Sequence, residues 1–146
     1  MLEKDQIKVF TYGSLREGFF NYNKYLKGKV IKNRPAKVKD FILYHMPYKG
    51  YPAVLKGHGE VYGEVMRLSD YNEVMSAVDE MEGFISKGNP SNEYNKDLVE
   101  VLYEDGTKEL CYSYIYNKEK DINFDKEAIL VNSGDWKLYK QYSGIE

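Results

Sequence analysis

The chain has 146 residues, of which 42% are hydrophobic and 15% aromatic. This is enough apolar material for a globular core, and we expect residues 1–146 to form a single domain. The 21 basic and 23 acidic side chains give a net charge of -2, which provides no basic surface for nucleic acid or an anionic membrane.

The start of the chain and its hydropathy bear on location. Residues 1–5, Met-Leu-Glu-Lys-Asp, lack the apolar core of a signal peptide. No stretch approaches the ~18 consecutive apolar residues of a transmembrane helix. The sequence therefore predicts a cytoplasmic protein that does not enter a membrane.

The first predicted element is a strand that ends in a glycine turn. The run from Ile7 to Tyr12 is apolar and aromatic, which is typical of a strand. Gly13 is free to take a positive φ and predicts a sharp turn. Ser14 and Leu15 follow, so several backbone N–H groups emerge without a partner in the predicted sheet. Such a turn can bind a carboxylate or carbonyl oxygen, although an ordinary glycine turn would have the same local sequence.

The next third of the chain alternates between extended segments and turns. Residues 21–26 predict one or two turns of an amphipathic helix. Residues 36–46 are rich in β-formers and predict a long strand. Residues 50–55 are expected to be extended because the residue before a proline avoids the α region. The glycines of residues 57–59 predict a turn, and residues 61–68 predict a further strand.

The clearest helix is predicted from Asp70 to Glu82, where apolar residues recur with a period of about 3.6. Glu73 completes a capping box with Asp70, and Gly83 is a typical C-terminal stop. On a helical wheel Glu82 falls about 40° from Val78, inside the apolar stripe. Partial desolvation and the negative end of the helix dipole would both raise the pKa of its carboxyl group. The alternative is that the helix frays and that Glu82 lies in water.

The remaining elements are short. Residues 86–92 form a polar segment with glycine and proline, which predicts a mobile lid. Strands are expected at 98–103 and 110–116, joined by a tight hairpin at the Asp105-Gly106 pair. A short helix is expected at 125–131.

Several side chains belong to types that bind ligands or react. By the period-two rule the last long strand carries three tyrosines on one face, Tyr112, Tyr114 and Tyr116. Strand tyrosines more often pack than contact a ligand. Cys111, the single cysteine, has no histidine nearby in the sequence, which argues against a nucleophilic role. His45 and His58 have no cysteine or acidic partner at metal-ligand spacing, so we expect no metal site.

Four stretches of the chain occur in a characteristic order. They are Phe-Thr-Tyr-Gly-Ser-Leu-Arg-Glu-Gly at 10–18, Gly-Tyr-Pro-Ala-Val at 50–54, Val-Asp-Glu-Met-Glu-Gly-Phe at 78–84 and Tyr-Asn-Lys-Asp-Leu-Val-Glu-Val at 94–101. With Tyr-Ser-Tyr at 112–114 and Gly-Asp-Trp at 134–136, they resemble the gamma-glutamylcyclotransferase-like (AIG2-like) family over nearly the whole chain. The sequence departs from the family at Lys96, where an arginine is frequent, and at Tyr112, where a tryptophan is frequent.

The resemblance implies an α+β fold, a small mixed β-barrel flanked by short helices, with a cavity between the first turn and the helix end. It also implies a reaction without a cofactor, in which the α-amine of a γ-glutamyl group attacks its own γ-carbonyl. The products would be 5-oxoproline and a free amine or amino acid. Glu82 would be the general acid and base. The residues implied in substrate binding are Tyr12, Gly13, Ser14, Leu15 and Tyr114.

Two other functions remain open at this point. The same cavity can belong to a regulatory module that binds a small ligand without turnover, because a fold does not fix a function. A nucleic-acid-binding barrel with stacking tyrosines is disfavoured by the acidic balance. We expect the partner to be a small γ-glutamyl compound whose leaving group contacts residues 86–92. The sequence defines neither that leaving group nor the oligomeric state.

Overall fold

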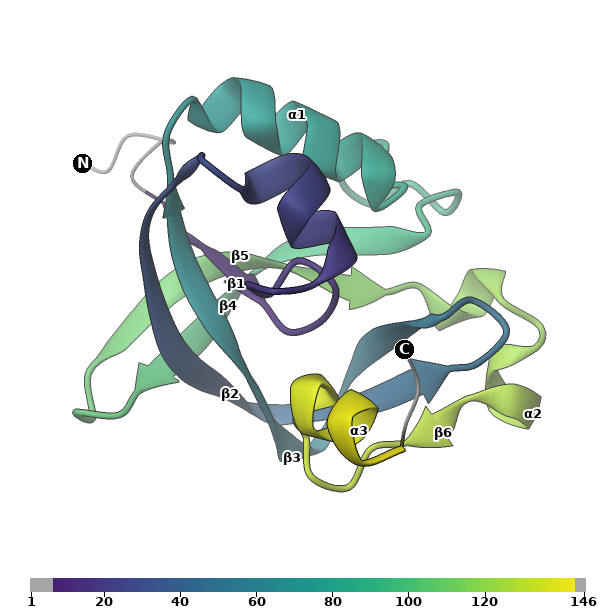
Figure 1. Cartoon of the computed structure of the whole chain (residues 1–146). Coiled ribbons are helices and arrows are strands. Elements are labelled where there is room, and N and C mark those ends of the chain that lie inside the picture. Colours follow the sequence, from purple (N-terminus) through teal and green to yellow (C-terminus); the bar gives the residue numbers. More distant parts are fainter. Residues whose placement is uncertain (1–6, 144–146) are drawn as a thin grey trace.

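The computed structural model describes residues 7–143, and its centre is a closed barrel (Figure 1). Its strands are β1 (Val9–Thr11), β2 (Val30–Met46), β3 (Tyr51–Leu68), β4 (Tyr94–Tyr103) and β5 (Lys108–Tyr116). The order around the barrel is β3-β1-β5-β4-β2, and a further β2–β3 pairing closes it. β1 and β5 run parallel while the other neighbours run antiparallel. The predicted small mixed β-barrel with short helices is confirmed.

The β2–β3 hairpin is longer than the sequence predicts. β2 begins at Val30 rather than at Ala36, and β3 continues through residues 57–59, so the turn predicted there is wrong. The register shifts at this point, with three residues of β3 opposite one of β2, and β3 continues as a strand through the irregularity. A Cβ at Gly57 would lie 2.4 Å from the Cδ1 atom of Ile42, so that this side chain would have to move, and a Cβ at Gly59 would lie 2.9 Å from the backbone carbonyl oxygen of Phe41.

Helix α1 (Tyr71–Met81) lies against one end of the barrel (Figure 1). Its C-terminus is a Schellman motif in which Gly83 has a φ of +68°. The N–H of Phe84 donates to the carbonyl of Asp79 at 2.9 Å, and the N–H of Gly83 donates to that of Glu80 at 3.1 Å. The predicted helix and its glycine stop are therefore confirmed.

The predicted capping box at the start of α1 is wrong. Asp70 has a φ of +49° and its side chain makes no capping hydrogen bond. Its carboxylate instead accepts a hydrogen bond from Lys29 at 3.0 Å. A capping residue normally has an extended backbone, and the left-handed backbone of Asp70 departs from that geometry, which accounts for the difference.

The smaller elements complete the fold. They are η2 (Tyr22–Leu26), η3 (Lys118–Lys120), α2 (Phe124–Glu127), β6 (Ile129–Leu130) and α3 (Trp136–Ser143). η2, a π-helical turn, confirms the predicted short helix, and the predicted hairpin joins β4 and β5 around Gly106, whose φ is +89°. The predicted helix at 125–131 is wrong beyond Glu127, because Ile129 and Leu130 pair with β2 instead.

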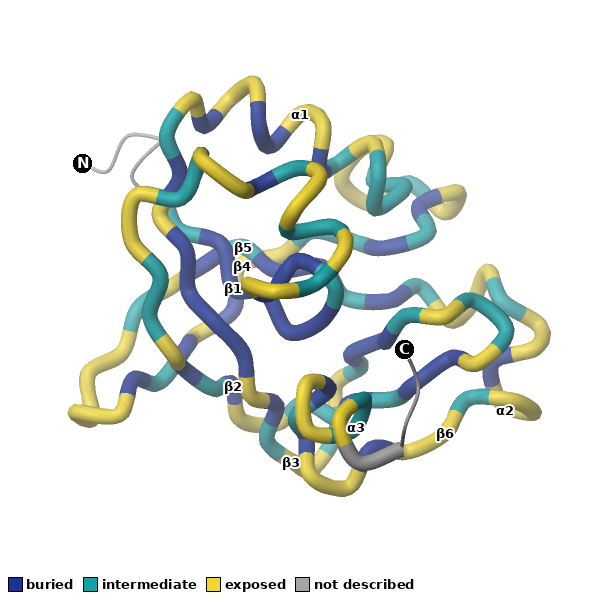
Figure 2. Tube along the Cα trace, viewed as in Figure 1, coloured by how far each residue is buried: buried dark blue, intermediate teal, exposed yellow. Residues whose placement is uncertain are grey.

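Buried side chains form two clusters, one on each face of the sheet. Figure 2 shows where buried residues lie along the chain. Neighbours along a strand alternate between them: Val9 packs in the cluster beneath α1, whereas Phe10 packs in the cluster that includes Trp136. Within residues 7–143, no helix is long and apolar enough to cross a membrane.

Candidate active site

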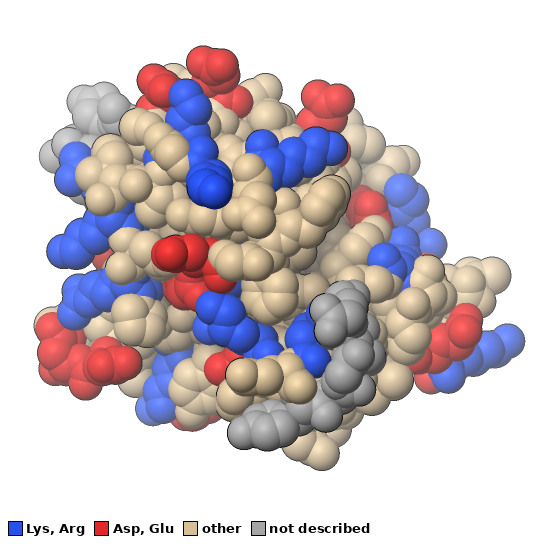
Figure 3. Space-filling view, viewed as in Figure 1, with Lys and Arg blue, Asp and Glu red and all other residues tan. Residues whose placement is uncertain are grey.

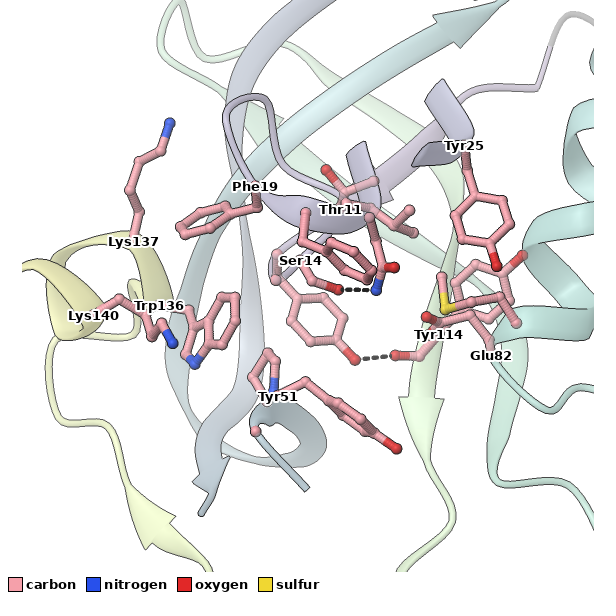
Figure 4. A pocket seen from close by; sticks show the side chains of 18 of the residues that line it. Thr11, Ser14, Phe19, Tyr25, Tyr51, Glu82, Tyr114, Trp136, Lys137 and Lys140 are labelled. Atoms are coloured by element: carbon pink, nitrogen blue, oxygen red, sulfur yellow. Dashed lines mark hydrogen bonds between the residues drawn. The ribbon is translucent and has the colours of Figure 1, made fainter. Parts of the chain in front are cut away.

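A cavity of about 1160 Å³ opens between the turn after β1, the C-terminal end of α1 and α3. All six residues that the sequence analysis implicates line it: Tyr12, Gly13, Ser14, Leu15, Glu82 and Tyr114. Figure 4 shows Glu82 and Tyr114 on one side, Trp136 and Lys140 on the other, and Ser14 between them. The cavity therefore has two ends of different chemistry.

The turn after β1 contributes unpaired backbone groups to this cavity. The N–H of Arg16 donates to the carbonyl of Gly13 at 2.9 Å, which closes the turn. Within residues 7–143, the N–H groups of Gly13, Ser14 and Leu15 donate to no protein acceptor. Gly13 does not have the positive φ that we expected. Glycine is needed for another reason, because a Cβ there would lie 2.6 Å from the Cγ atom of Pro52.

Arg16 holds the turn in place without lining the cavity. Its guanidinium is buried and donates to Glu64 at 3.0 Å and to Asp135, which precedes α3, at 2.8 Å. Burial would raise the pKa of Glu64, but hydrogen bonds from Asn33, the Glu17 N–H and Arg16 lower it below its ordinary value. One guanidinium thereby fixes the turn to the barrel and to α3, a role that the sequence analysis did not predict.

Glu82 is the C-cap residue of α1, and its backbone is helical rather than frayed. The side chain is half-buried, and within the described part of the chain no group donates a hydrogen bond to its carboxylate. Burial, followed by the nearby charges of Glu93 and Asp79, raises its pKa to about 8. The prediction of a raised pKa is confirmed, and the frayed alternative is wrong.

Tyr12 and Tyr114 connect the two sides of this end of the cavity. The hydroxyl of Tyr12 donates to the carbonyl oxygen of Tyr114 at 2.5 Å. The hydroxyl of Tyr114 donates to Asp79 at 2.5 Å, and Lys96 also donates to Asp79 at 3.0 Å. Lys96 itself does not line the cavity. Lys96 therefore contributes to the support of α1 rather than to the cavity wall.

The structure adds lining residues that the sequence analysis missed, notably Tyr51, Glu93, Tyr94 and Trp136. The hydroxyl of Tyr51 donates to Glu93 at 2.8 Å, and that of Tyr94 donates to the carbonyl of Pro52 at 2.6 Å. Trp136 packs against Phe19 with 5.2 Å between ring centroids. Motifs at 50–54, 94–101 and 134–136 contained three of these residues, but nothing local assigned them to the cavity.

The loop at 86–92 does not line the cavity, so its predicted role as a lid that contacts the leaving group is wrong. Asn92 is fully buried. Its side chain accepts a hydrogen bond from the Ile85 N–H at 2.6 Å and donates to the Ser86 carbonyl at 2.8 Å. This amide holds the loop closed on itself, away from Glu82.

Groups with potential metal or thiol chemistry lie elsewhere. No cluster of three or more His, Cys, Asp or Glu side chains suited to a metal ion occurs among residues 7–143. His45 is buried and accepts a hydrogen bond from the Trp136 indole at 3.2 Å. Burial raises the pKa of the Cys111 thiol to about 12, so it stays unreactive at neutral pH.

Comparisons with known proteins agree with this geometry. The family model described as gamma-glutamyl cyclotransferase, AIG2-like, matches residues 9–138. A Methanocaldococcus jannaschii protein, provisionally named a gamma-glutamylcyclotransferase, is 30% identical over 135 residues, covering 90% of this chain and 97% of the relative.

Solved structures show the same fold. An uncharacterized Pyrococcus horikoshii protein superposes with a TM-score of 0.64 at 23% identity, covering 94% of this chain and 96% of the other. An AIG2-like protein from Mus musculus superposes with a TM-score of 0.58 at 20% identity, covering 75% of this chain and 76% of the other.

Proposed function

Because the chain belongs to the gamma-glutamyl cyclotransferase, AIG2-like family, we propose that it converts a γ-glutamyl amine or γ-glutamyl amino acid to 5-oxoproline. The released product is the amine or amino acid. One observation carries this proposal: a carboxylate with a pKa near 8, that of Glu82, lines the same cavity as the unpaired N–H groups of residues 13–15.

The proposed reaction begins with substrate orientation. The N–H groups of Gly13, Ser14 and Leu15 bind an oxygen of the substrate, either its α-carboxylate or its γ-carbonyl. This holds the γ-glutamyl group folded back, with its α-nitrogen next to its γ-carbonyl carbon. Ring closure from a conformer held in this way has a small remaining entropic cost.

Proton transfer is assigned to Glu82. Its ionised carboxylate takes a proton from the substrate's α-ammonium, and the neutral amine then forms a bond to the γ-carbonyl carbon. Glu82 returns this proton to the leaving nitrogen as the original amide bond breaks. The ring nitrogen then loses its second surplus proton through Glu82 to the released amine, which departs as an ammonium, so no external acid or base is consumed. A pKa near 8 suits both steps, because general acid and base catalysis is most efficient when the pKa lies near the working pH.

A second candidate function is a module that binds the same ligand without turnover. The environment of Glu82 favours the enzyme. A carboxylate that only bound a cation would serve best with a low pKa, fully ionised at neutral pH. The pKa of Glu82 is raised to about 8, which suits a group that takes up and releases a proton.

The test is an assay for product. Purified protein is incubated with γ-glutamyl dipeptides, glutathione and γ-glutamyl alkylamines, and 5-oxoproline is measured by mass spectrometry. Formation of 5-oxoproline from at least one compound, abolished by boiling the protein, is expected. Saturable ligand binding without any 5-oxoproline would overturn the enzymatic function and favour the binding module.

A further inference from the structure

Glu93 places a second carboxylate at the Glu82 end of the cavity. Its backbone N–H donates to the carbonyl of Gly83 at 2.9 Å, so it lies beside the end of α1. One carboxylate oxygen, Oε2, accepts hydrogen bonds from Lys49 at 2.9 Å and from Tyr51 at 2.8 Å. Within residues 7–143 the other oxygen, Oε1, has no hydrogen-bond partner. Oε1 lies 3.4 Å from the place where a Cβ of residue 83 would be.

Four of the phenols that line this end of the cavity donate their protons to acceptors of the protein. They are the hydroxyls of Tyr12, Tyr51, Tyr94 and Tyr114. Burial raises the pKa of each phenol, so each keeps its proton at neutral pH. A hydroxyl has a single proton, and toward the cavity these oxygens can therefore only accept.

This end of the cavity is thus rich in hydrogen-bond acceptors and carries two carboxyl groups. Lys49 lines the cavity beside Glu93, and its ammonium is already paired with Oε2. The complementary ligand group has several N–H donors and a positive charge, which describes a primary ammonium.

We propose that Glu93 binds the α-ammonium group of the substrate together with Glu82, through the oxygen that Lys49 and Tyr51 leave free. The proposal rests on the function proposed above, because only a γ-glutamyl substrate brings its α-ammonium to Glu82. Glu93 is a positioning residue: it aims the ammonium at the carboxylate that removes its proton. Lys49 and Tyr51 fix the rotamer of Glu93, so that Oε1 is presented to the ligand.

The test compares ligands that differ only in the ammonium group. γ-Glutamyl-alanine and glutaryl-alanine share a backbone, but the second lacks the α-amine. Their affinities are measured by calorimetry for Glu82→Gln, in which turnover is suppressed, and for the double variant Glu82→Gln/Glu93→Gln. The matched control is Glu82→Gln/Glu17→Gln, which makes the same chemical change at an exposed carboxylate of the same cavity.

The Glu82→Gln protein and the Glu17 control should both prefer γ-glutamyl-alanine over glutaryl-alanine. In the Glu93 double variant this preference should fall by roughly tenfold or more, the value of a charge-assisted hydrogen bond. Affinity for 5-oxoproline, which has no ammonium, should stay within about threefold, since the pocket itself is intact.

Two results would overturn the role of Glu93. One is an unchanged preference in the Glu93 double variant. The other is an equal loss of affinity for all three ligands, which would make Glu93 merely structural. Failure of the proposed function gives a different pattern: wild-type protein forms no 5-oxoproline from any γ-glutamyl compound, while the binding preference is measured independently of turnover.

Discussion

Glu82 is positioned by its backbone and left unsatisfied at its side chain. The Schellman motif around Gly83 fixes the C-cap residue, and the same glycine allows Glu93 to approach, because a Cβ at Gly83 would lie 2.8 Å from the Cβ of Glu93. Burial and two acidic neighbours then raise the pKa of a group that nothing stabilises. Such conflicts with local stability are expected at functional sites, where binding of a ligand resolves them.

The first prediction concerns Glu82→Gln, which keeps the shape of the side chain and removes its titratable group. Formation of 5-oxoproline should fall by about two to four orders of magnitude, the usual loss for a general base. The control is Glu80→Gln, an exposed carboxylate of the same helix end outside the cavity, which should react at the wild-type rate. Wild-type turnover in Glu82→Gln would remove Glu82 from the mechanism.

The second prediction concerns Gly13, where the constraint is the Pro52 ring rather than the backbone conformation. Gly13→Val should abolish turnover and 5-oxoproline binding, because the Cβ would meet a rigid ring at 2.6 Å and displace the turn. Gly13→Ala should reduce turnover and binding less than Gly13→Val does, and Ser14→Ala should reduce them less than Gly13→Ala.

A double variant tests this cause directly. Gly13→Ala/Pro52→Ala should recover much of the binding that Gly13→Ala loses, since the alanine at 52 removes the Cγ and Cδ atoms. Equal impairment of the single and double variants would show that the ring is not the obstacle.

At the scale of elements, the sequence predicted what is local and missed what depends on a partner strand. α1, its glycine stop and the place of Glu82 on the buried face follow from periodicity within one segment. Burial on that face is the first cause of its raised pKa, whereas the nearby charge of Glu93 comes from outside the segment. The two glycines within residues 57–59 resemble a turn sequence. In the structure they instead allow β3 to pack closely against Ile42 and Phe41 of β2, because a Cβ at either glycine would clash with these residues. Tertiary pairing of this kind overrides local turn signals.

The candidate site also contains residues that short motifs predicted and residues that only tertiary packing brings together. The turn after β1 and Glu82 were predicted because their chemistry is visible within short motifs. The opposite wall depends on the packing of Phe19 against Trp136, two residues that only the closed barrel brings together. No local pattern indicates that pair.

The third prediction concerns α3, which lines the cavity end opposite Glu82 (Figure 4). The ammonium of Lys140 lies 5.2 Å from the Trp136 ring, and no carboxylate of residues 7–143 forms an ion pair with it. The alanine leaving group carries a carboxylate that this ammonium can bind, whereas the ethylamine leaving group carries none. Lys140→Gln should therefore lower kcat/KM for γ-glutamyl-alanine relative to γ-glutamyl-ethylamine by roughly fivefold, as expected for a partly exposed charge pair.

Lys126→Gln, the same change on exposed α2, should leave the ratio of the two substrates unchanged. A deletion within residues 87–90 should leave it unchanged too, because that loop does not line the cavity. If Lys140→Gln keeps the wild-type ratio, α3 does not contact the leaving group.

At the scale of the molecule, the charges are balanced and dispersed, and acidic and basic side chains are interspersed on the face that Figure 3 shows. Folding shifts the pKa values of two carboxyl groups, those of Glu64 and Glu82, in opposite directions. Glu64 accepts the hydrogen bonds that tie Arg16 and Asn33 to the barrel, and its pKa is lowered. The pKa of Glu82 is raised. Folding therefore favours the protonated form of Glu82 and the ionised form of Glu64.

The last prediction follows from the sign of these shifts. An ordinary glutamate has a pKa near 4.5, and folding raises that of Glu82 to about 8. Between these values the folded state binds more protons than the unfolded state, so the contribution of Glu82 to stability falls as the pH rises from about 4.5 to about 8. Glu64 acts oppositely: its lowered pKa stabilises the fold above about pH 4.5, and this stabilisation is lost as the pH falls through its folded pKa.

Thermal melting of wild type, Glu82→Gln and Glu64→Gln between about pH 3 and pH 9 measures both effects, because the Glu64 contribution is lost only below about pH 4.5. At the acid end of the range, Glu82→Gln should have the same melting temperature as wild type. Toward pH 9 its melting temperature should rise progressively above that of wild type. The free-energy difference should grow by at most about 1.4 kcal/mol per pH unit, and by less where the open cavity screens the charge. Glu64→Gln should melt below wild type at neutral pH, and the gap should narrow in acid. A constant difference in unfolding free energy between Glu82→Gln and wild type across this range would contradict the prediction. It would mean that the Glu82 carboxyl group has its ordinary pKa in the folded protein, and that the acidic end of the cavity does not raise it.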